Sequence, residues 1–259
     1  MDTKNIINGS QERLITGLVL LGIAIVIVAV DALSEHHFLT WLALGVIAFF
    51  AFDETVKMLR IENKKIYIYA ALAWVAALFY PTPEILTFGV LVVILSVMAF
   101  KNNVEYKLLF PILYPLAPML FLLALPEDFG IEYLVWLVFI VGMTDTAAYY
   151  TGKSIGVTLF SPVSPKKTWE GFYAGVTAGT IFGVVVGMFM VSFWAALIIS
   201  VSVSLSSVFG DLFESYIKRS AGVKDSGNIL PGHGGMLDRA DGYLFGAVVM
   251  VILLRILSN

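Results

Sequence analysis

The sequence contains no cysteine, so it can form neither a disulfide bond nor a thiolate metal site. Charge is also scarce, because Asp, Glu, Lys and Arg make up 14% of the 259 residues, whereas about a quarter is usual in soluble domains. Hydrophobic residues make up 59%, and the mean hydropathy is +0.90. These values exclude an ordinary soluble domain and indicate a membrane protein.

Three other features are missing. Gly152-Lys153-Ser154 ends like a phosphate-binding P-loop, but the position of its first glycine holds Ala147. No clear small-residue cleavage pattern follows the apolar run 14–30, so we expect this run to be a retained helix rather than a signal peptide. Repeated halves are not evident, and many transporter folds are built from such repeats.

Nine apolar segments are present, some shorter than the about 20 residues that an untilted span needs. They cover residues 14–30, 38–53, 66–80, 84–100, 108–125, 131–151, 171–190, 193–214 and 242–257. Backbone polar groups have no water partner in lipid, so these segments should be helical. The sequence therefore predicts an all-α polytopic membrane protein with about nine transmembrane helices.

Lysine and arginine predict the orientation. With nine spans, fifteen of the sixteen cations fall on one side, and only Arg255 lies outside this set. Since cytoplasmic loops are rich in Lys and Arg, the N-terminus is predicted to be cytoplasmic and the C-terminus outside. The polar loops 152–170 and 215–241 then face the cytoplasm. We divide the chain into N-terminal and middle helices (1–130) and a catalytic C-terminal part (131–259).

The segment 215–241 is the long polar interruption in the apolar second half of the chain. Its 27 residues contain four cations, three aspartates, one histidine and five glycines. Charged groups beside a membrane are costly unless they bind a charged partner. We therefore expect the chemistry of this protein to take place here.

Polar side chains also recur at helical spacing before and into this segment, which places them on one helix face. They are Ser200, Ser204, Ser207, Asp211, Glu214, Ser215 and Lys218. The serines suit helix packing as well as function, because small residues let membrane helices approach closely. Asp211 needs a partner or a cation at this depth. The sequence leaves two roles open for Glu214, which are a function in the site and pairing with Lys218 at i+4.

Glycines and acids in the segment indicate phosphate and metal chemistry. Gly232, Gly234 and Gly235 let backbone N–H groups approach an anion closely. His233 lies among them, as a donor to phosphate or as a turn-stabilising group. Oxygen ligands suited to Mg²⁺ come from Asp211, Asp225, Asp238 and Asp241. Such acids, interleaved with cations, suit phosphoryl or nucleotidyl transfer.

Two further sites lie before the segment. Lys166 and Lys167 suit an anionic lipid headgroup or a triphosphate, although ordinary juxtamembrane lysines fit equally well. Asp145 lies inside the apolar segment 131–151, and an intramembrane acid is a functional candidate by default.

In their order along the chain, these residues resemble the C-terminal motif of phosphatidate cytidylyltransferases, also called CDP-diacylglycerol synthases. The pattern is Ser215-x-x-Lys218-Arg219, Lys224-Asp225-x-Gly227, Pro231-x-His233-Gly-Gly and Asp238-Arg239-x-Asp241. The resemblance to the family extends to three other stretches, which are Gly210-Asp211-Leu-Phe-Glu-Ser, Asp145-Thr-Ala-Ala-Tyr and Ser164-Pro-Lys-Lys-Thr-Trp-Glu-Gly. The resemblance covers the second half of the chain, and Ala240 departs from it because the family has a larger apolar residue there.

The resemblance implies an enzyme of phospholipid biosynthesis that converts CTP and phosphatidate to CDP-diacylglycerol and pyrophosphate with Mg²⁺. It implies a homodimer in the bacterial inner membrane, among membrane lipids, with the active site facing the cytoplasm and no nucleic acid partner. Under this resemblance Asp211 and Asp238 bind metal, with Asp225 and Asp241 as further candidates. The groups expected to contact phosphates are Lys218, Arg219, Lys224, His233 and Arg239, with Lys166, Lys167, Gly234 and Gly235 binding the lipid phosphate or the triphosphate.

Other functions compete with this one. A transporter would use Asp145 and Asp211 as ion sites, but it does not account for the segment 215–241. A related enzyme acting on another lipid, such as a polyprenol kinase or an archaeal-lipid cytidylyltransferase, is closer in chemistry. A CDP-alcohol phosphotransferase would need Asp-Gly-x-x-Ala-Arg, whereas Asp241-Gly242 is followed by Tyr-Leu-Phe-Gly.

Overall fold

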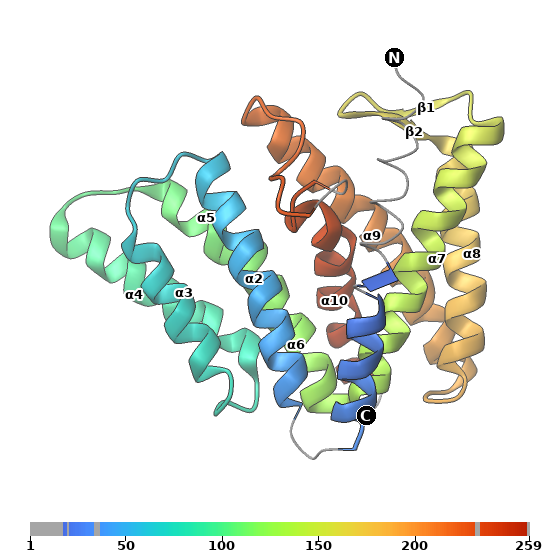
Figure 1. Cartoon of the computed structure of the whole chain (residues 1–259), viewed down its shortest axis with the longest axis horizontal. Helices are drawn as coiled ribbons and strands as arrows, with labels where there is room; N and C mark the ends of the chain where they lie inside the picture. The colour runs from blue at the N-terminus through green and yellow to red at the C-terminus, as the bar shows by residue number, and fades with distance from the viewer. Residues whose placement is uncertain (1–17, 20, 34–36, 231–233, 258–259) are drawn as a thin grey trace.

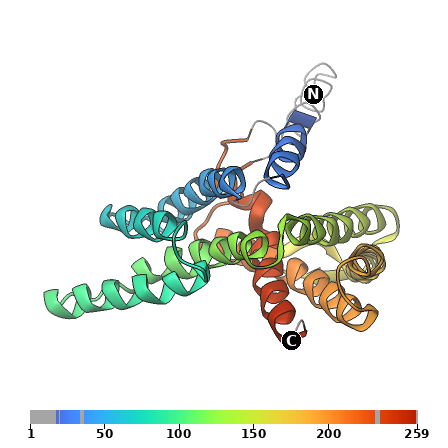
Figure 2. The ribbon, with the colours of Figure 1, turned by 90° about the horizontal axis from the view of Figure 1, so that it is seen from below.

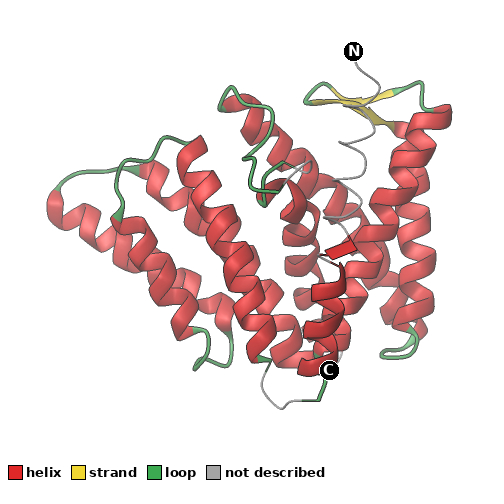
Figure 3. Cartoon of the chain, in the orientation of Figure 1, coloured by secondary structure: helices red, strands yellow, loops and turns green. Residues whose placement is uncertain are grey.

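The computed structural model describes residues 18–19, 21–33, 37–230 and 234–257, most of which are helical (Figure 1, Figure 3). A short helix over Leu21–Asp31 comes first. The elements that follow are α2 (Phe38–Met58), α3 (Lys65–Ala76), η1 (Pro83–Ile85), α4 (Leu86–Lys101), η2 (Tyr106–Leu108), α5 (Leu109–Pro111), η3 (Ile112–Leu116), α6 (Ala117–Phe129), α7 (Ile131–Ile155), β1 (Leu159–Ser161), β2 (Ser164–Thr168), α8 (Trp169–Gly187), α9 (Phe193–Ser220) and α10 (Leu237–Leu257).

Within the described ranges, seven helices are long and apolar enough to cross a membrane. They cover Phe38–Met58, Pro83–Lys101, Tyr106–Phe129, Ile131–Ile155, Trp169–Gly187, Phe193–Ser220 and Leu237–Leu257. Apolar side chains such as Phe88 and Val185 are exposed on their outer faces, as lipid contact requires. These helices confirm an all-α polytopic membrane protein, apart from the small hairpin β1–β2.

Two predicted spans match shorter helices. The segment 66–80 corresponds to α3, and the described part of 14–30 corresponds to the helix Leu21–Asp31. Both helices are shorter than a bilayer core requires without other adjustment. The count of nine crossings and the orientation of the termini therefore stay predictions.

The helix α10 is the element that the other helices share. It packs against α9, α6, α7 and α2, and Figure 2 shows α6 and α10 between α3–α4 on one side and α7–α9 on the other. Fully buried side chains fill these contacts, among them Leu123, Leu137, Leu244 and Met250. In a bilayer such close packing, rather than exclusion of water, holds helices together.

The helix α8 approaches α7 and α9 through a row of glycines. The row consists of Gly171, Gly175, Gly179, Gly183 and Gly187, all buried. A Cβ at Gly179 would collide with Thr144 Oγ1 and Ser204 Oγ. Those two hydroxyls hydrogen-bond each other at 3.2 Å, and Ser200 is also fully buried. The serines Ser200 and Ser204 are therefore packing residues of this interface.

The predicted polar loop 215–241 is helical at both ends, which is a correction to the sequence-based boundaries; the described residues between the helices, 221–230 and 234–236, are called the loop 221–236. Both flanking helices extend into the polar segment. Hydropathy marks where a chain leaves the membrane, whereas a helix ends where a cap forms. Gly222 has φ +77°, and the N–H of Val223 donates to the carbonyl of Lys218 at 2.9 Å, which is the helix-ending motif that glycine favours.

The predicted loop 152–170 also needs correction. Helices α7 and α8 enter it from both sides, and the antiparallel hairpin β1–β2 joins them by pairing Leu159 with Thr168. The Thr168 hydroxyl caps α8 by accepting a hydrogen bond from the N–H of Gly171 at 3.2 Å. The pair Lys166 and Lys167 thus lies on a strand rather than in an irregular loop.

Arg255, the cation outside the predicted cytoplasmic set, lies in the last turns of α10. Its Nη1 is 2.7 Å from Oε1 of Glu84, and its Nη2 is 2.6 Å from Oδ2 of Asp128. These ion pairs join the end of α10 to η1 and α6. The exception to the charge pattern is therefore a neutralised cation.

Candidate active site

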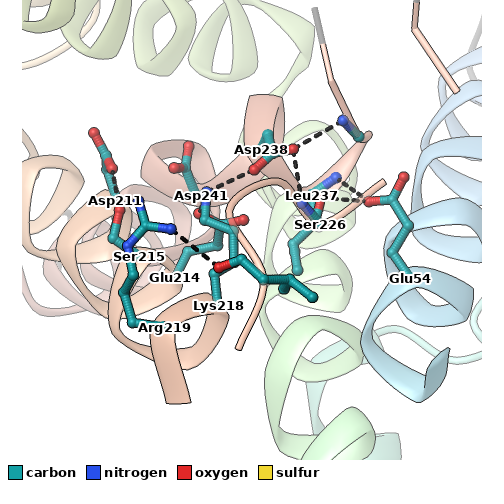
Figure 4. A network of polar contacts seen from close by, with 12 residues as sticks. Glu54, Asp211, Glu214, Ser215, Lys218, Arg219, Ser226, Leu237, Asp238 and Asp241 are labelled. Carbon is teal, nitrogen blue, oxygen red and sulfur yellow. Dashed lines mark hydrogen bonds and ion pairs between the residues drawn. The ribbon is translucent and has the colours of Figure 1, made fainter. Parts of the chain in front are cut away.

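The C-terminal end of α9 and the N-terminal end of α10 meet at a buried lysine (Figure 4). Lys218 pairs with Glu214, one helical turn earlier, and its Nζ lies 2.6 Å from Oδ1 of Asp238. The Lys218 side chain is 10% exposed and that of Glu214 is 0% exposed. The i+4 pairing of Glu214 with Lys218, one of the two roles considered for Glu214, is present, whereas the contact of Lys218 with Asp238 was not predicted. Burial makes this ionic triad sensitive to the loss of any member.

Asp238 also organises the loop that joins the two helices. Its Oδ2 accepts hydrogen bonds from the N–H of Ser226 at 3.0 Å and the N–H of Gly235 at 2.8 Å. The neighbouring Gly234 has φ +86°, a conformation that favours glycine. Asp238 therefore receives three donors from α9 and the loop 221–236.

Glu54, from the first half of the chain, is a site residue that the sequence analysis missed. It is 3% exposed on α2. Its carboxylate accepts from the Ser226 hydroxyl at 2.8 Å and from the N–H groups of Met236 and Leu237 at 2.9 Å each (Figure 4). A carboxylate is favoured at a helix N-terminus, where backbone N–H groups lack partners. The acids Asp53 and Glu54 at the end of an apolar run were the available signal.

The position of Glu54 also explains why the residues that contact its carboxylate include two glycines, Gly227 and Gly235. A Cβ at Gly235 would lie 2.6 Å from Glu54 Oε2 and 2.6 Å from the backbone nitrogen of Gly227. A Cβ at Gly227 would meet the other Glu54 oxygen, Oε1. The backbone at Gly227 and at Gly235 is thus packed tightly around a carboxylate from α2.

A second group of charges lies alongside the triad. Lys167 Nζ is 2.6 Å from Oδ2 of Asp211, which brings the hairpin strand β2 against α9. The carboxylates of Asp145, Asp211 and Asp241 are within electrostatic range of one another. They come from α7, α9 and α10, so three helices contribute to one acidic cluster. Asp145 and Asp241, which are far apart in sequence, join the predicted site here.

The remaining predicted residues are more exposed. Arg219 donates from Nη1 to the carbonyl of Val223 at 3.0 Å, and Arg239 is exposed within electrostatic range of Asp145. Lys166 is exposed on β2. Lys224 and Asp225 are exposed on the loop 221–236. His233 lies outside the described residues.

The oxygen donors fit a divalent cation in chemistry. Asp145, Asp211 and Asp241 place three carboxylates within electrostatic range of one another, and Lys167 is the ammonium paired with Asp211. Mg²⁺ takes few protein carboxylates and completes its shell with water and substrate phosphates. In the described part of the chain, however, no three His, Asp or Glu side chains already converge at metal-binding geometry. The acids would have to close around the ion.

Comparison with known proteins extends over nearly the whole chain. A family model described as the cytidylyltransferase family matches residues 11–257. A protein named phosphatidate cytidylyltransferase from Helicobacter pylori is 40% identical over 251 residues, covering 96% of this chain and 93% of that relative. Proteins of the same name from Brucella suis and Staphylococcus epidermidis are 39% identical over 133 residues and 43% identical over 129 residues. They cover 47% and 48% of this chain, and 49% and 50% of their own lengths.

Proposed function

Because the chain belongs to the cytidylyltransferase family, we propose that the facing ends of α9 and α10 form the active site of a phosphatidate cytidylyltransferase. The enzyme joins CTP to phosphatidate and releases CDP-diacylglycerol and pyrophosphate. The observation that carries this assignment is the contact of Lys218 with Glu214 and Asp238, because it joins a Glu–Lys pair of α9 to an acid of α10 that lies 20 positions beyond the lysine. The extended similarity to the Helicobacter pylori protein supports the same reaction.

The reaction needs positioning more than acid–base catalysis. The phosphate of phosphatidate is already an anionic nucleophile, so no strong general base is required. Its oxygen attacks the α-phosphorus of CTP, a new P–O bond forms, and the bond to the pyrophosphate leaving group breaks. The site then has to align two phosphates and neutralise the charge between them.

We assign the charged residues by their contacts. Asp211 and Asp241 would hold Mg²⁺, which supplies charge neutralisation when it is bound. Asp238 instead holds Lys218 and the loop 221–236, since its oxygens already accept from three donors. Asp225 remains a weaker candidate because it is exposed on the loop.

The exposed cations suit the triphosphate. Arg219, Lys224, Arg239 and Lys166 lie at the solvent side of the site, where CTP would arrive. Lys167 is already at Asp211 and is placed to neutralise a phosphate there. His233, Gly234 and Gly235 complete this proposed phosphate-binding set.

The proposed location is the inner membrane, with the site facing the cytoplasm and two copies forming a homodimer. The distribution of fifteen of sixteen Lys and Arg residues supports this orientation. CTP is a cytoplasmic metabolite, so a site on the other side would be inconsistent with the reaction.

The test is direct assay of the purified full chain with labelled CTP, phosphatidate and Mg²⁺. We expect labelled CDP-diacylglycerol and an equal amount of pyrophosphate, with no product when phosphatidate is left out. A folded protein that makes no CDP-diacylglycerol would overturn the proposal. Phosphorylation of a polyprenol instead would favour the related-kinase alternative.

A further inference from the structure

The candidate span Tyr106–Phe129 is not a continuous α-helix. Between α5 and α6 the segment Ile112–Leu116 winds differently, and Tyr114 has the extended backbone angles φ −153° and ψ 112°. Non-helical backbone inside a membrane span is tolerated where it is buried in protein or lines a cavity. The ring of Pro115 disfavours helical angles at the residue before it, and the break is accommodated because Tyr114 is buried in protein.

The Tyr114 hydroxyl is buried without a protein partner. The residue is 3% exposed, and none of the described residues hydrogen-bonds its oxygen. A buried donor left without a hydrogen bond destabilises the folded protein. Phenylalanine would provide the same ring without this cost, so the hydroxyl weakens the unliganded protein.

The hydroxyl lies near the acidic cluster of the proposed active site. It is within electrostatic range of Asp241, Glu214 and Asp211. The Tyr114 ring packs edge-on against Phe213 at 5.0 Å and Phe245 at 6.0 Å between ring centroids. Tyr114 thus stands between an aromatic wall and the polar site.

That aromatic wall belongs to an apolar groove of about 380 Å³. The groove runs between the broken span, α9 and α10, and its lining includes Phe110, Leu113, Tyr114, Phe213, Phe245 and Val249. Leu113 is 52% exposed, so the groove reaches the outer surface of these apolar helices. In a bilayer that surface faces lipid.

We propose that this groove holds an acyl chain of phosphatidate and that the Tyr114 hydroxyl donates a hydrogen bond to the phosphate of the same lipid. This inference rests on the proposed function. Phosphatidate carries an apolar chain and a phosphate in one molecule, as the groove and the buried donor require. CTP has no apolar chain, and it reaches the site from the exposed cations instead. Tyr114 is then a lipid-binding residue that the polar motif does not include.

The first test is Tyr114→Phe, which removes the hydroxyl and keeps the ring. We expect the KM for phosphatidate, expressed as its mole fraction in mixed micelles, to rise about tenfold, the usual effect of one lost hydrogen bond to a charged group. The KM for CTP should stay within about twofold, and the thermal midpoint should not fall, because a buried unpaired group is removed. Tyr106→Phe is the matched control, since Tyr106 is 73% exposed at the start of the same span.

The second test fills the groove with Val249→Phe. The kcat/KM of this variant should fall more for dioleoyl phosphatidate than for dihexanoyl phosphatidate, because only the long chain extends along the groove. Equal losses for both lipids would overturn the groove as the acyl site. An unchanged lipid KM in Tyr114→Phe, or a raised KM for CTP in its place, would overturn the role of the hydroxyl. Wild-type protein that makes no CDP-diacylglycerol would instead overturn the proposed function itself.

Discussion

The two ends of α10 each carry a network of charges that joins the first half of the chain to the second. At the C-terminal end, Arg255 pairs with Glu84 and Asp128. At the N-terminal end, Asp238 pairs with Lys218, and Glu54 accepts hydrogen bonds from the first backbone N–H groups. Each end includes one deeply buried acid from the first half, because Glu54 is 3% and Glu84 is 4% exposed.

The difference lies in what surrounds each network. The Arg255 end is a single cation between two acids, and its side chain is 37% exposed. The Asp238 end adds the cluster of Asp145, Asp211 and Asp241 beside a fully buried Glu214. Surplus acid within a membrane protein is costly unless a cation or a substrate compensates it. The first network joins helices to one another, whereas the second is the proposed ligand site.

The largest difference in activity between the two ends of α10 is expected when one acid at each end is replaced. Asp211→Asn removes a charge proposed to hold Mg²⁺, and we expect kcat to fall about 10³-fold, as for the loss of a preorganised charged group. Asp128→Asn, at the Arg255 end, should leave kcat within about twofold. Radiolabelled CTP incorporation into lipid measures both variants. Comparable losses in the two would mean that the ends do not differ in function.

Removing the central cation at each end tests stability instead. Lys218→Met leaves Glu214 and Asp238 buried without their counter-ion, and we expect a loss of about 3–5 kcal/mol. Arg255→Met should cost less, because Arg255 and Asp128 are partly exposed to solvent, although the buried Glu84 also loses its counter-ion. Thermal unfolding in one detergent at one heating rate compares the two. A larger loss for Arg255→Met would reverse our assignment of the buried network.

The site was predictable where its residues are close in sequence and unpredictable where they are not. Lys218, Asp238 and Asp211 belong to one polar stretch, so spacing and residue type were enough to select them. Glu54 reaches Ser226 across 172 positions, and no local pattern encodes that contact. Tyr114 is a buried aromatic residue in an apolar run, and only its unpaired hydroxyl distinguishes it.

The fold shows the same division. Hydropathy located the apolar spans because it reports the surrounding solvent. It misplaced the ends of α9 and α10, since the cap at Gly222 and the carboxylate of Glu54 determine where those helices stop and start. It also missed the hairpin β1–β2, which is too short to leave a periodic signal.

The smallest predicted effect on kcat comes from replacing the two buried acids of the first half, Glu54 and Glu84. Glu54→Gln places an amide N–H₂ against the donors of Ser226, Met236 or Leu237, because both carboxylate oxygens accept hydrogen bonds. The start of α10 should loosen, and kcat should fall about tenfold, as expected when one charge-assisted hydrogen bond is lost.

Glu84→Gln is the matched variant at the other end. It retains an acceptor for Arg255, which lies at the opposite end of α10 from the proposed site, so kcat should not change. Hydrogen exchange separates a positioning effect from general unfolding. In Glu54→Gln the amides of Met236 and Leu237 should exchange faster while the middle of α10 stays protected. Full activity with this faster exchange would show that the anchored loop is not needed for catalysis, and the two ends of α10 would then differ only in their charge.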